Sequence, residues 1–175
     1  LRFERAKRVA TLTVRGPQGP QPGTAEEARA LGAAWWPLAA FRELDDALLR
    51  LRFHEETLGV VQIRTEGDGE AVLAMDATLA RLRDDWFVRE VLLKMGRALR
   101  RLDLTARTFF AVIEPGSCFA GSLFELALAA DRSYLREDDE RATSIALSEL
   151  NAGALPMSHG LARLDVRFLA HPARA

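Results

Sequence analysis

The sequence alternates short apolar runs with longer segments of helical periodicity. Runs rich in β-branched and aromatic residues lie at 9–14, 59–65 and 108–113. Between them, 37–53 and 86–102 place apolar side chains at steps of three and four residues, with charged side chains in the gaps. The runs are typical of strands and the steps of amphipathic helices. This alternation predicts an α/β fold around a mainly parallel sheet, with ligands favoured at the carboxyl ends of the strands.

Two further helices are predicted by their start signals. Thr24, followed three residues later by Glu27, suits the first turn of a short helix that Gly32 ends. A second helix is predicted from 122 to 131, after a turn that contains glycine. The charged stretch at 136–141 predicts a solvated loop.

Size and charge set limits on the class of protein. The 175 residues are 49% hydrophobic, which predicts one domain, 1–175, with a single core. Twenty-four basic residues against 25 acidic ones give a net charge of -1, so neither nucleic acid nor an anionic membrane is an expected partner. We find no signal peptide and no apolar run of about 20 residues, the length that a membrane span needs.

Cysteine content and the two ends add two expectations. Cys118 is the single cysteine, which excludes an internal disulfide and fits a reducing cytoplasm. A first residue that is not methionine, Leu1, and an end at Ala175 soon after an apolar stretch favour a piece of a longer protein. Scattered histidines without metal-ligand spacing predict that there is no metal site.

The turn before the helix at 122 is the first candidate for chemistry. The first N–H groups of a helix lack partners inside it, so the segment 116–121 delivers free donors to one place. Two such donors can stabilise the negative charge that develops on a thioester oxygen. Glu125 lies one turn into the helix, and Glu149 follows the strand-like run 144–147. Two carboxylates in one apolar pocket would raise at least one pKa toward general acid–base use.

Two segments carry a resemblance to a known superfamily. Residues 118–131 combine a small-residue turn with Glu-Leu-Ala and a closing aspartate, and 147–156 precede Arg163 and Leu164. Both segments resemble the signature of the crotonase (enoyl-CoA hydratase) superfamily. The resemblance implies a crotonase-like (ClpP/crotonase) spiral of ββα units, here truncated.

A narrower resemblance, covering nearly the whole chain, is to the benzoyl-CoA-dihydrodiol lyases within that superfamily. It is carried by the segments 35–38, 43–47, 64–68, 84–90 and 113–121. It implies a carbon–carbon lyase of aerobic benzoate breakdown, which hydrolytically opens the ring of 2,3-epoxybenzoyl-CoA and releases formate. Coenzyme A would be part of the substrate, with no separate cofactor. It also implies two crotonase-like regions, of which this chain matches the C-terminal one, and a homo-oligomer is expected.

The resemblance also implies roles for individual residues. Glu125 and Glu149 fall on the two acid–base positions of the superfamily. The backbone N–H of Ser122, beside Gly121, falls on one oxyanion donor, and that of Met75 falls on the other. Met75 and Ser122 depart from the small residues that are usual there, which leaves a crowded oxyanion hole.

Two residues complete the candidate site, and other functions stay open. Arg107 could meet a coenzyme A phosphate, and His159 follows the loop after Glu149. The alternatives are a non-catalytic scaffold or interface domain of the same enzyme, and another acyl-CoA hydratase or isomerase.

Overall fold

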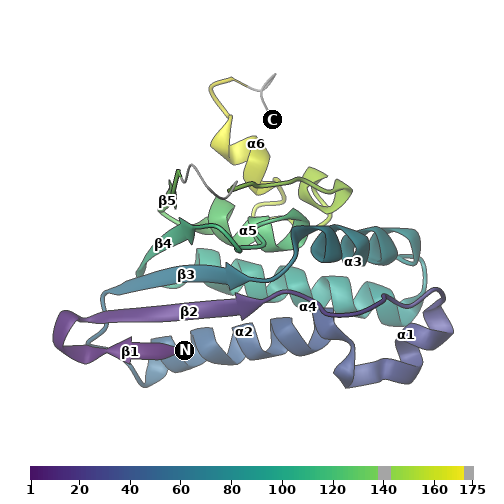
Figure 1. The fold of residues 1–175 in the computed structure, drawn as a ribbon, viewed down its shortest axis with the longest axis horizontal. Coiled ribbons are helices and arrows are strands. Elements are labelled where there is room, and N and C mark those ends of the chain that lie inside the picture. The colour runs from purple at the N-terminus through teal and green to yellow at the C-terminus, as the bar shows by residue number, and fades with distance from the viewer. Residues whose placement is uncertain (138–142, 172–175) are drawn as a thin grey trace.

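The computed structural model describes residues 1–137 and 143–171, and it contains one five-stranded sheet in the order β1-β2-β3-β4-β5 (Figure 1). The strands are β1 (Arg2–Glu4), β2 (Val9–Arg15), β3 (Val60–Glu66), β4 (Thr108–Ile113) and β5 (Arg132–Leu135). The short β1 runs antiparallel to β2, and every later neighbour pairs in parallel. The prediction of an α/β fold with a mainly parallel sheet is confirmed.

Helices form the crossovers between the parallel strands, as parallel pairing requires. The helices are η1 (Arg5–Lys7), α1 (Ala25–Leu31), η2 (Gly32–Ala34), α2 (Trp36–Phe53), α3 (Gly69–Arg81), α4 (Trp86–Asp103), α5 (Gly121–Ala129), η3 (Glu149–Ala152) and α6 (Arg163–Arg167). The helices α1 and α2 connect β2 to β3, α3 and α4 connect β3 to β4, and α5 connects β4 to β5.

The sheet buries one face more fully than the other. Along β3, Val61, Ile63 and Thr65 are buried, whereas the residues between them are partly exposed. Successive side chains of a strand point to opposite faces, so this alternation places the core on one side of the sheet. The buried apolar side chains form one cluster, to which Phe41 of α2 and Met95 of α4 belong.

The long helices agree with their predicted bounds. The predicted 37–53 corresponds to α2, and 86–102 corresponds to α4, each to within one residue. Their apolar stripes pack toward the core, which is why periodicity alone predicts them. The short helix α1 has the capping box between Thr24 and Glu27.

The elements that were not predicted include α3, β1 and β5, and one predicted run is weaker than expected. No helix is predicted at 69–81, where α3 forms, because its many small residues blur the division into an apolar and a polar face. The side chain of Asp68 caps the amino end of α3. The strands β1 and β5 are three and four residues long, too short for a clear alternation. The run at 144–147 forms only an isolated bridge between Ala120 and Ala146. Of the stretch predicted as a solvated loop, 138–141 lie outside the described residues.

Candidate functional site

The start of α5 is the centre of the candidate site. The chain leaves β4, turns, and enters α5 at Gly121, whose φ is +45°. A Cβ at this position would lie 2.0 Å from Oδ2 of Asp76 and 2.9 Å from Oγ of Ser148. Only glycine fits here, because the carboxylate of Asp76 approaches the backbone so closely.

The carboxylate of Asp76 binds the backbone N–H of Ser122, which was predicted to bind an oxyanion. The N–H of Ser122 donates to Oδ2 of Asp76 at 2.6 Å, and the hydroxyl of Ser148 donates to the same oxygen at 2.6 Å. The N–H of Gly121 donates to the carbonyl of Ala146 at 2.9 Å. The expectation that Gly121 and Ser122 present free donors is therefore wrong in this structure, because both N–H groups are bound to protein oxygens.

Met75 does not supply the second donor either. It is fully buried and lies in α3 beyond the first turn of that helix. Only the first N–H groups of a helix lack partners inside it, so the amide of Met75 belongs to the interior of α3. The expected pairing of Met75 and Ser122 as an open oxyanion hole is not formed.

Glu125 is buried in a charged cluster. Its Oε2 accepts from Nη1 of Arg163 at 2.9 Å, and its Oε1 accepts from Nδ2 of Asn151 at 2.6 Å. Arg163, which is 1% exposed, also makes two bonds to Asp103, of 3.0 and 2.7 Å. One guanidinium therefore binds two carboxylates and joins α4, α5 and α6.

Burial dominates the electrostatics of the two buried acids. It raises the pKa of Glu125, against the hydrogen bond from Asn151 and the charge of Arg163. It also raises the pKa of Asp76, against the hydrogen bonds from Ser122 and Ser148. Both shifts have the same cause, since water no longer solvates the charged form.

Glu149 lies in a different environment from Glu125. Its side chain is 65% exposed and is 3.6 Å from a guanidinium nitrogen of Arg83, which is 64% exposed. The two glutamates thus do not meet in one apolar pocket: one is buried and paired, and the other faces solvent. The catalytic role of either residue stays a prediction.

The two remaining candidates lie apart from this cluster. The guanidinium of Arg107 donates to the carbonyl of Leu51 at 3.1 Å, at the amino end of β4. A six-residue strand spans about 20 Å, and α5 begins beyond its other end. His159 is exposed, and its Nδ1 accepts from the N–H of Leu161 at 3.4 Å.

Sequence reasoning missed the residues that fill the site. Asp76 follows Met75 directly, Arg163 lies beside a segment that carries the resemblance, and no sequence pattern assigns a role to Asn151. A chemical signal did exist, since a buried acid must find donors and a buried arginine must find acceptors. The identity of these donors and acceptors, such as the N–H of Ser122 for Asp76, depends on the tertiary structure. Two buried oxygens, Oδ1 of Asp76 and Oγ of Ser122, have no partner among the described atoms.

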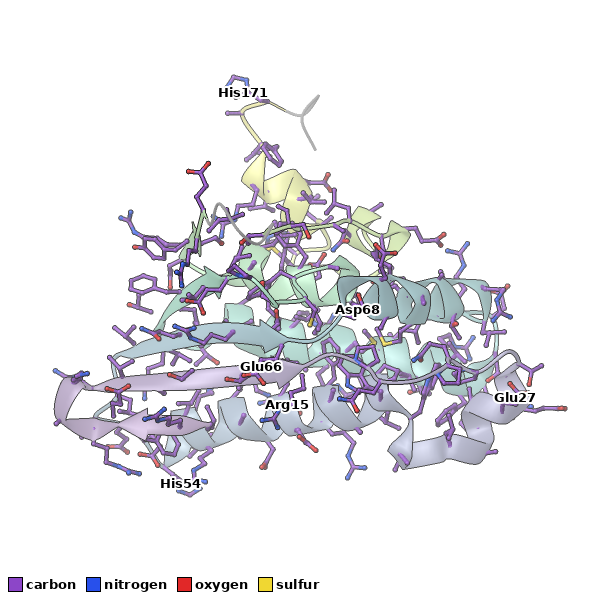
Figure 2. The ribbon with its side chains drawn as sticks, in the orientation of Figure 1. Arg15, Glu27, His54, Glu66, Asp68 and His171 are labelled. Carbon is purple, nitrogen blue, oxygen red and sulfur yellow. The ribbon has the colours of Figure 1, made fainter. Side chains whose placement is uncertain are left out.

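The described cavities lie elsewhere. One of about 530 Å³ opens at the carboxyl ends of β2 and β3, where Figure 2 labels Arg15, Glu66 and Asp68. It is the position that the βαβ pattern favours for ligands. Another, of about 730 Å³, is mostly apolar and is lined by residues of α5, β5 and α6, among them Phe124 and Leu135.

Two features are absent from the described residues. No group of three or more histidine, cysteine, aspartate or glutamate side chains in 1–137 and 143–171 could hold a metal ion. None of the helices within these ranges combines the length and apolar character of a membrane span.

Comparison with solved structures gives partial matches. An enoyl-CoA hydratase/isomerase from Marinobacter aquaeolei is 18% identical, covers 55% of this chain and 38% of its own, and has a TM-score of 0.39. The enoyl-CoA hydratase from Bacillus halodurans is 17% identical, covers 54% of this chain and 38% of its own, and has a TM-score of 0.40. No protein-family model matches the chain.

Comparison with curated proteins gives a much stronger match. The benzoyl-CoA-dihydrodiol lyase of Aromatoleum evansii is 51% identical over 161 residues. The match covers 92% of this chain but only 29% of the relative, so this chain spans less than a third of that protein. The resemblance drawn from the sequence is confirmed: over most of its length, this chain is related to a stretch of benzoyl-CoA-dihydrodiol lyase.

Proposed function

We propose that this chain is part of a carbon–carbon lyase that hydrolytically opens the ring of 2,3-epoxybenzoyl-CoA and releases formate. The 51% identity to a benzoyl-CoA-dihydrodiol lyase supports this proposal. Coenzyme A enters as part of the substrate, and we expect no separate cofactor. The enzyme would act in the cytoplasm, which the single cysteine of this chain fits.

Within that enzyme, we propose that this chain supports the structure and that the proton transfers take place elsewhere. One observation carries the proposal: Oδ2 of Asp76 accepts the hydrogen bond from the N–H of Ser122. An oxyanion hole works by free donors aimed at the developing negative charge. A carboxylate at that place removes the donor, and when ionised it would repel the thioester oxyanion.

The surroundings of Glu125 support the same role. A general acid or base needs a path to the proton that it moves. Both oxygens of Glu125 are held by Asn151 and Arg163, and the residue is 1% exposed. Such a cluster ties helices together, whereas an acid–base group needs access to substrate.

An exposed apolar face supports an interface role. The side chains of Leu135 and Leu147 are about half exposed, and they line the apolar cavity beside α5. Faces of this kind are commonly covered by a partner surface. We propose that this face contacts another part of the lyase, its N-terminal crotonase-like region or a second copy in a homo-oligomer.

A single substitution separates the supporting role from the catalytic one. Glu125→Gln in the full-length lyase should leave the rate of formate release from 2,3-epoxybenzoyl-CoA within about twofold, while thermal stability or the size-exclusion profile changes. If Glu125 and Glu149 move protons, the same variant loses ring opening. Glu149→Gln is the control, since its exposed side chain should affect neither stability nor assembly.

The substrate class needs its own test. Purified full-length lyase is offered 2,3-epoxybenzoyl-CoA and, separately, a simple straight-chain enoyl-CoA. Formate from the first and no hydration of the second is the expected result. Hydration of the enoyl-CoA without formate release would identify another acyl-CoA hydratase or isomerase instead.

A further inference from the structure

The edge of β2 is only partly paired. Antiparallel pairing with β1 places Arg2 opposite Thr11, whereas β2 continues to Arg15. By this register Leu1 stands opposite Leu12. The last three residues of β2, 13–15, therefore pair with β3 on one side and with no strand among the described residues on the other.

The backbone groups on this free edge can be identified. The carbonyl of Arg8 accepts from the N–H of Gly59, and the N–H of Gly16 donates to the carbonyl of Glu66, so even-numbered residues here face β3. Successive residues of a strand direct their backbone groups to opposite edges. Thr13 and Arg15 therefore direct theirs to the free edge.

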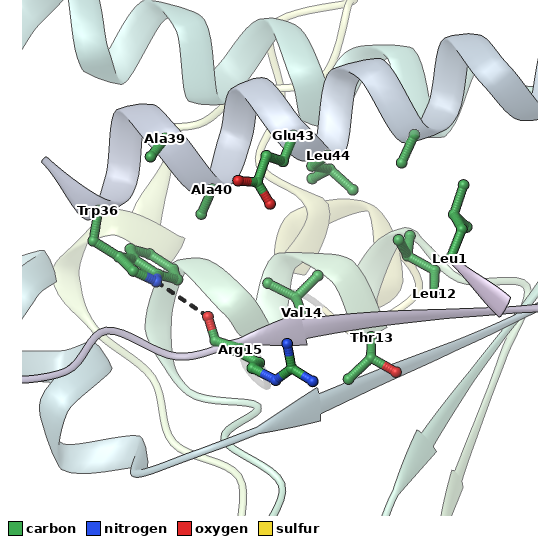
Figure 3. A pocket seen from close by; sticks show the side chains of 11 residues that line it. Leu1, Leu12, Thr13, Val14, Arg15, Trp36, Ala39, Ala40, Glu43 and Leu44 are labelled. Atoms are coloured by element: carbon green, nitrogen blue, oxygen red, sulfur yellow. Dashed lines mark hydrogen bonds between the residues drawn. The ribbon is translucent and has the colours of Figure 1, made fainter. Parts of the chain in front are cut away.

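One of these groups is already bound. The indole Nε1 of Trp36 donates to the carbonyl of Arg15 at 3.1 Å, which confirms the direction of that residue (Figure 3). Trp36 thereby closes the edge at its far end. The N–H and C=O of Thr13 and the N–H of Arg15 remain for another chain.

A groove accompanies the free edge. A cavity of about 330 Å³ lies between the end of β2 and the helix α2. Figure 3 shows Leu1 at one end of it and Trp36 at the other. On the helix side its wall carries the short side chains of Ala39, Ala40 and Ala47, which leave room beside the strand.

We propose that this groove holds a strand of the longer lyase polypeptide, formed by the residues directly upstream of Leu1. The inference rests on the proposed function, because that places this chain within a longer enzyme. The strand runs antiparallel to β2 as a continuation of β1, since the register of β1 leads into the groove without a break. It is three residues long, opposite 13–15, and stops at Trp36.

The register also specifies the chemistry of this strand. The residue before Leu1 stands opposite Thr13 and exchanges backbone hydrogen bonds with it, as alternate antiparallel pairs do. The second residue upstream stands opposite Val14 and shares its face, toward α2, so it should be apolar and of moderate size.

Strand addition explains the edge better than a small ligand does. An unpaired strand edge is a template for a further strand, because its donors and acceptors already have the spacing of a sheet. Along 13–15 these groups stand beside a wall of Ala39, Ala40 and Leu44 that also carries Glu43, and an extended segment with one inward side chain covers it.

Hydrogen exchange at single amides tests the proposal. The N–H of Thr13 is followed in this 175-residue chain and in the full-length lyase, with Ile63 of β3 as the internal reference. We expect at least tenfold slower exchange of Thr13 in the full-length lyase, and no such change at Ile63. Equal exchange of Thr13 in both proteins would overturn the proposal.

Two variants of the full-length lyase identify the occupant. Proline at the residue directly before Leu1 removes the N–H that would donate to the carbonyl of Thr13, which disrupts the paired strand, and Ala40→Leu fills the groove; each should restore fast exchange of Thr13. Ala33→Leu, in exposed η2, is the matched control and should keep the protection. Protection that survives the proline variant, or that varies with protein concentration as a second copy requires, would contradict the upstream strand.

The test of the upstream strand and the test of the lyase activity can fail independently. Ring opening by a full-length lyase whose Thr13 amide exchanges fast would reject the strand and keep the function. A protected Thr13 in a protein without lyase activity would reject the function and keep the strand.

Discussion

The carboxylate of Asp76, in α3, accepts the backbone N–H of Ser122, at the start of α5, at 2.6 Å. It reaches this amide because Gly121 has no side chain, and the hydroxyl of Ser148 completes the contact. Three segments that are distant in the sequence are joined through one oxygen. The contact makes the first turn of α5 part of the core, whereas a helix with a free first turn could bind an anion there.

Replacing Gly121 by alanine should strongly destabilise the protein. The new Cβ would lie 2.0 Å from Oδ2 of Asp76, so either the carboxylate or the start of α5 must move. We expect a loss of more than about 3 kcal/mol in the free energy of unfolding, as for other severe core disruptions. Urea denaturation followed by circular dichroism measures it.

Gly116→Ala is the control for that substitution. Gly116 also has a positive φ, +86°, but a Cβ there meets nothing within 4 Å. Gly116→Ala should lower the free energy of unfolding only by the conformational cost of placing a side chain at positive φ, about 1–2 kcal/mol. The double variant of Gly121→Ala with Asp76→Ala should lose less than the sum of the two single variants. Strict additivity would mean that the clash with Asp76 is not the cause.

Asp76 should make stability depend on pH in a specific direction. Its folded-state pKa is raised above the ordinary 3.8, chiefly by burial. A raised pKa means that its contribution to stability is fully present below about pH 4 and is lost as the pH rises through the folded-state value. Compared with Asp76→Asn, the wild type should therefore lose free energy of unfolding as the pH rises above 4.

Denaturation curves from pH 4 to 8 measure this difference. Asp46→Asn, at an exposed position of α2, is the control and should change neither the level nor the slope. A difference between wild type and Asp76→Asn that is constant over this pH range would argue against a buried acid that titrates.

Arg163 should be the most sensitive member of the charged cluster. Arg163→Met leaves the carboxylates of Glu125 and Asp103 without their shared cation, and breaking a buried pair in this way costs about 3–5 kcal/mol. Arg83→Met, which removes the exposed pair with Glu149, should cost less than about 1 kcal/mol. Thermal denaturation of both variants checks the contrast, and equal losses would contradict the burial of the cluster.

Cys118 should react slowly with thiol reagents in the folded protein. It is 1% exposed, and burial raises the pKa of its thiol, so little reactive thiolate forms at neutral pH. Alkylation by iodoacetamide, followed by mass spectrometry, should be at least tenfold slower in buffer than in concentrated urea. Rapid stoichiometric modification of the native protein would show that the thiol is accessible.

Much of the fold could be predicted because its signals are local. The periodicity of α2 and α4, the β-branched runs of β3 and β4, and the cap at Thr24 each involve neighbouring residues. The short β1 and β5 could not be predicted, since three or four residues carry too little pattern and form only against the strand beside them.

The candidate site was predictable in its parts and not in its assembly. The sequence by itself determined that a glycine turn would open a helix carrying Glu125, because backbone conformation and helical spacing are local properties. Only the tertiary structure decided that Asp76, 46 residues away, would bind that turn, and that Glu125 would face Arg163 while Glu149 faced solvent. The physical reason is that a buried charge must be matched by whichever group packing brings within about 3 Å, and that group depends on how whole elements fit together.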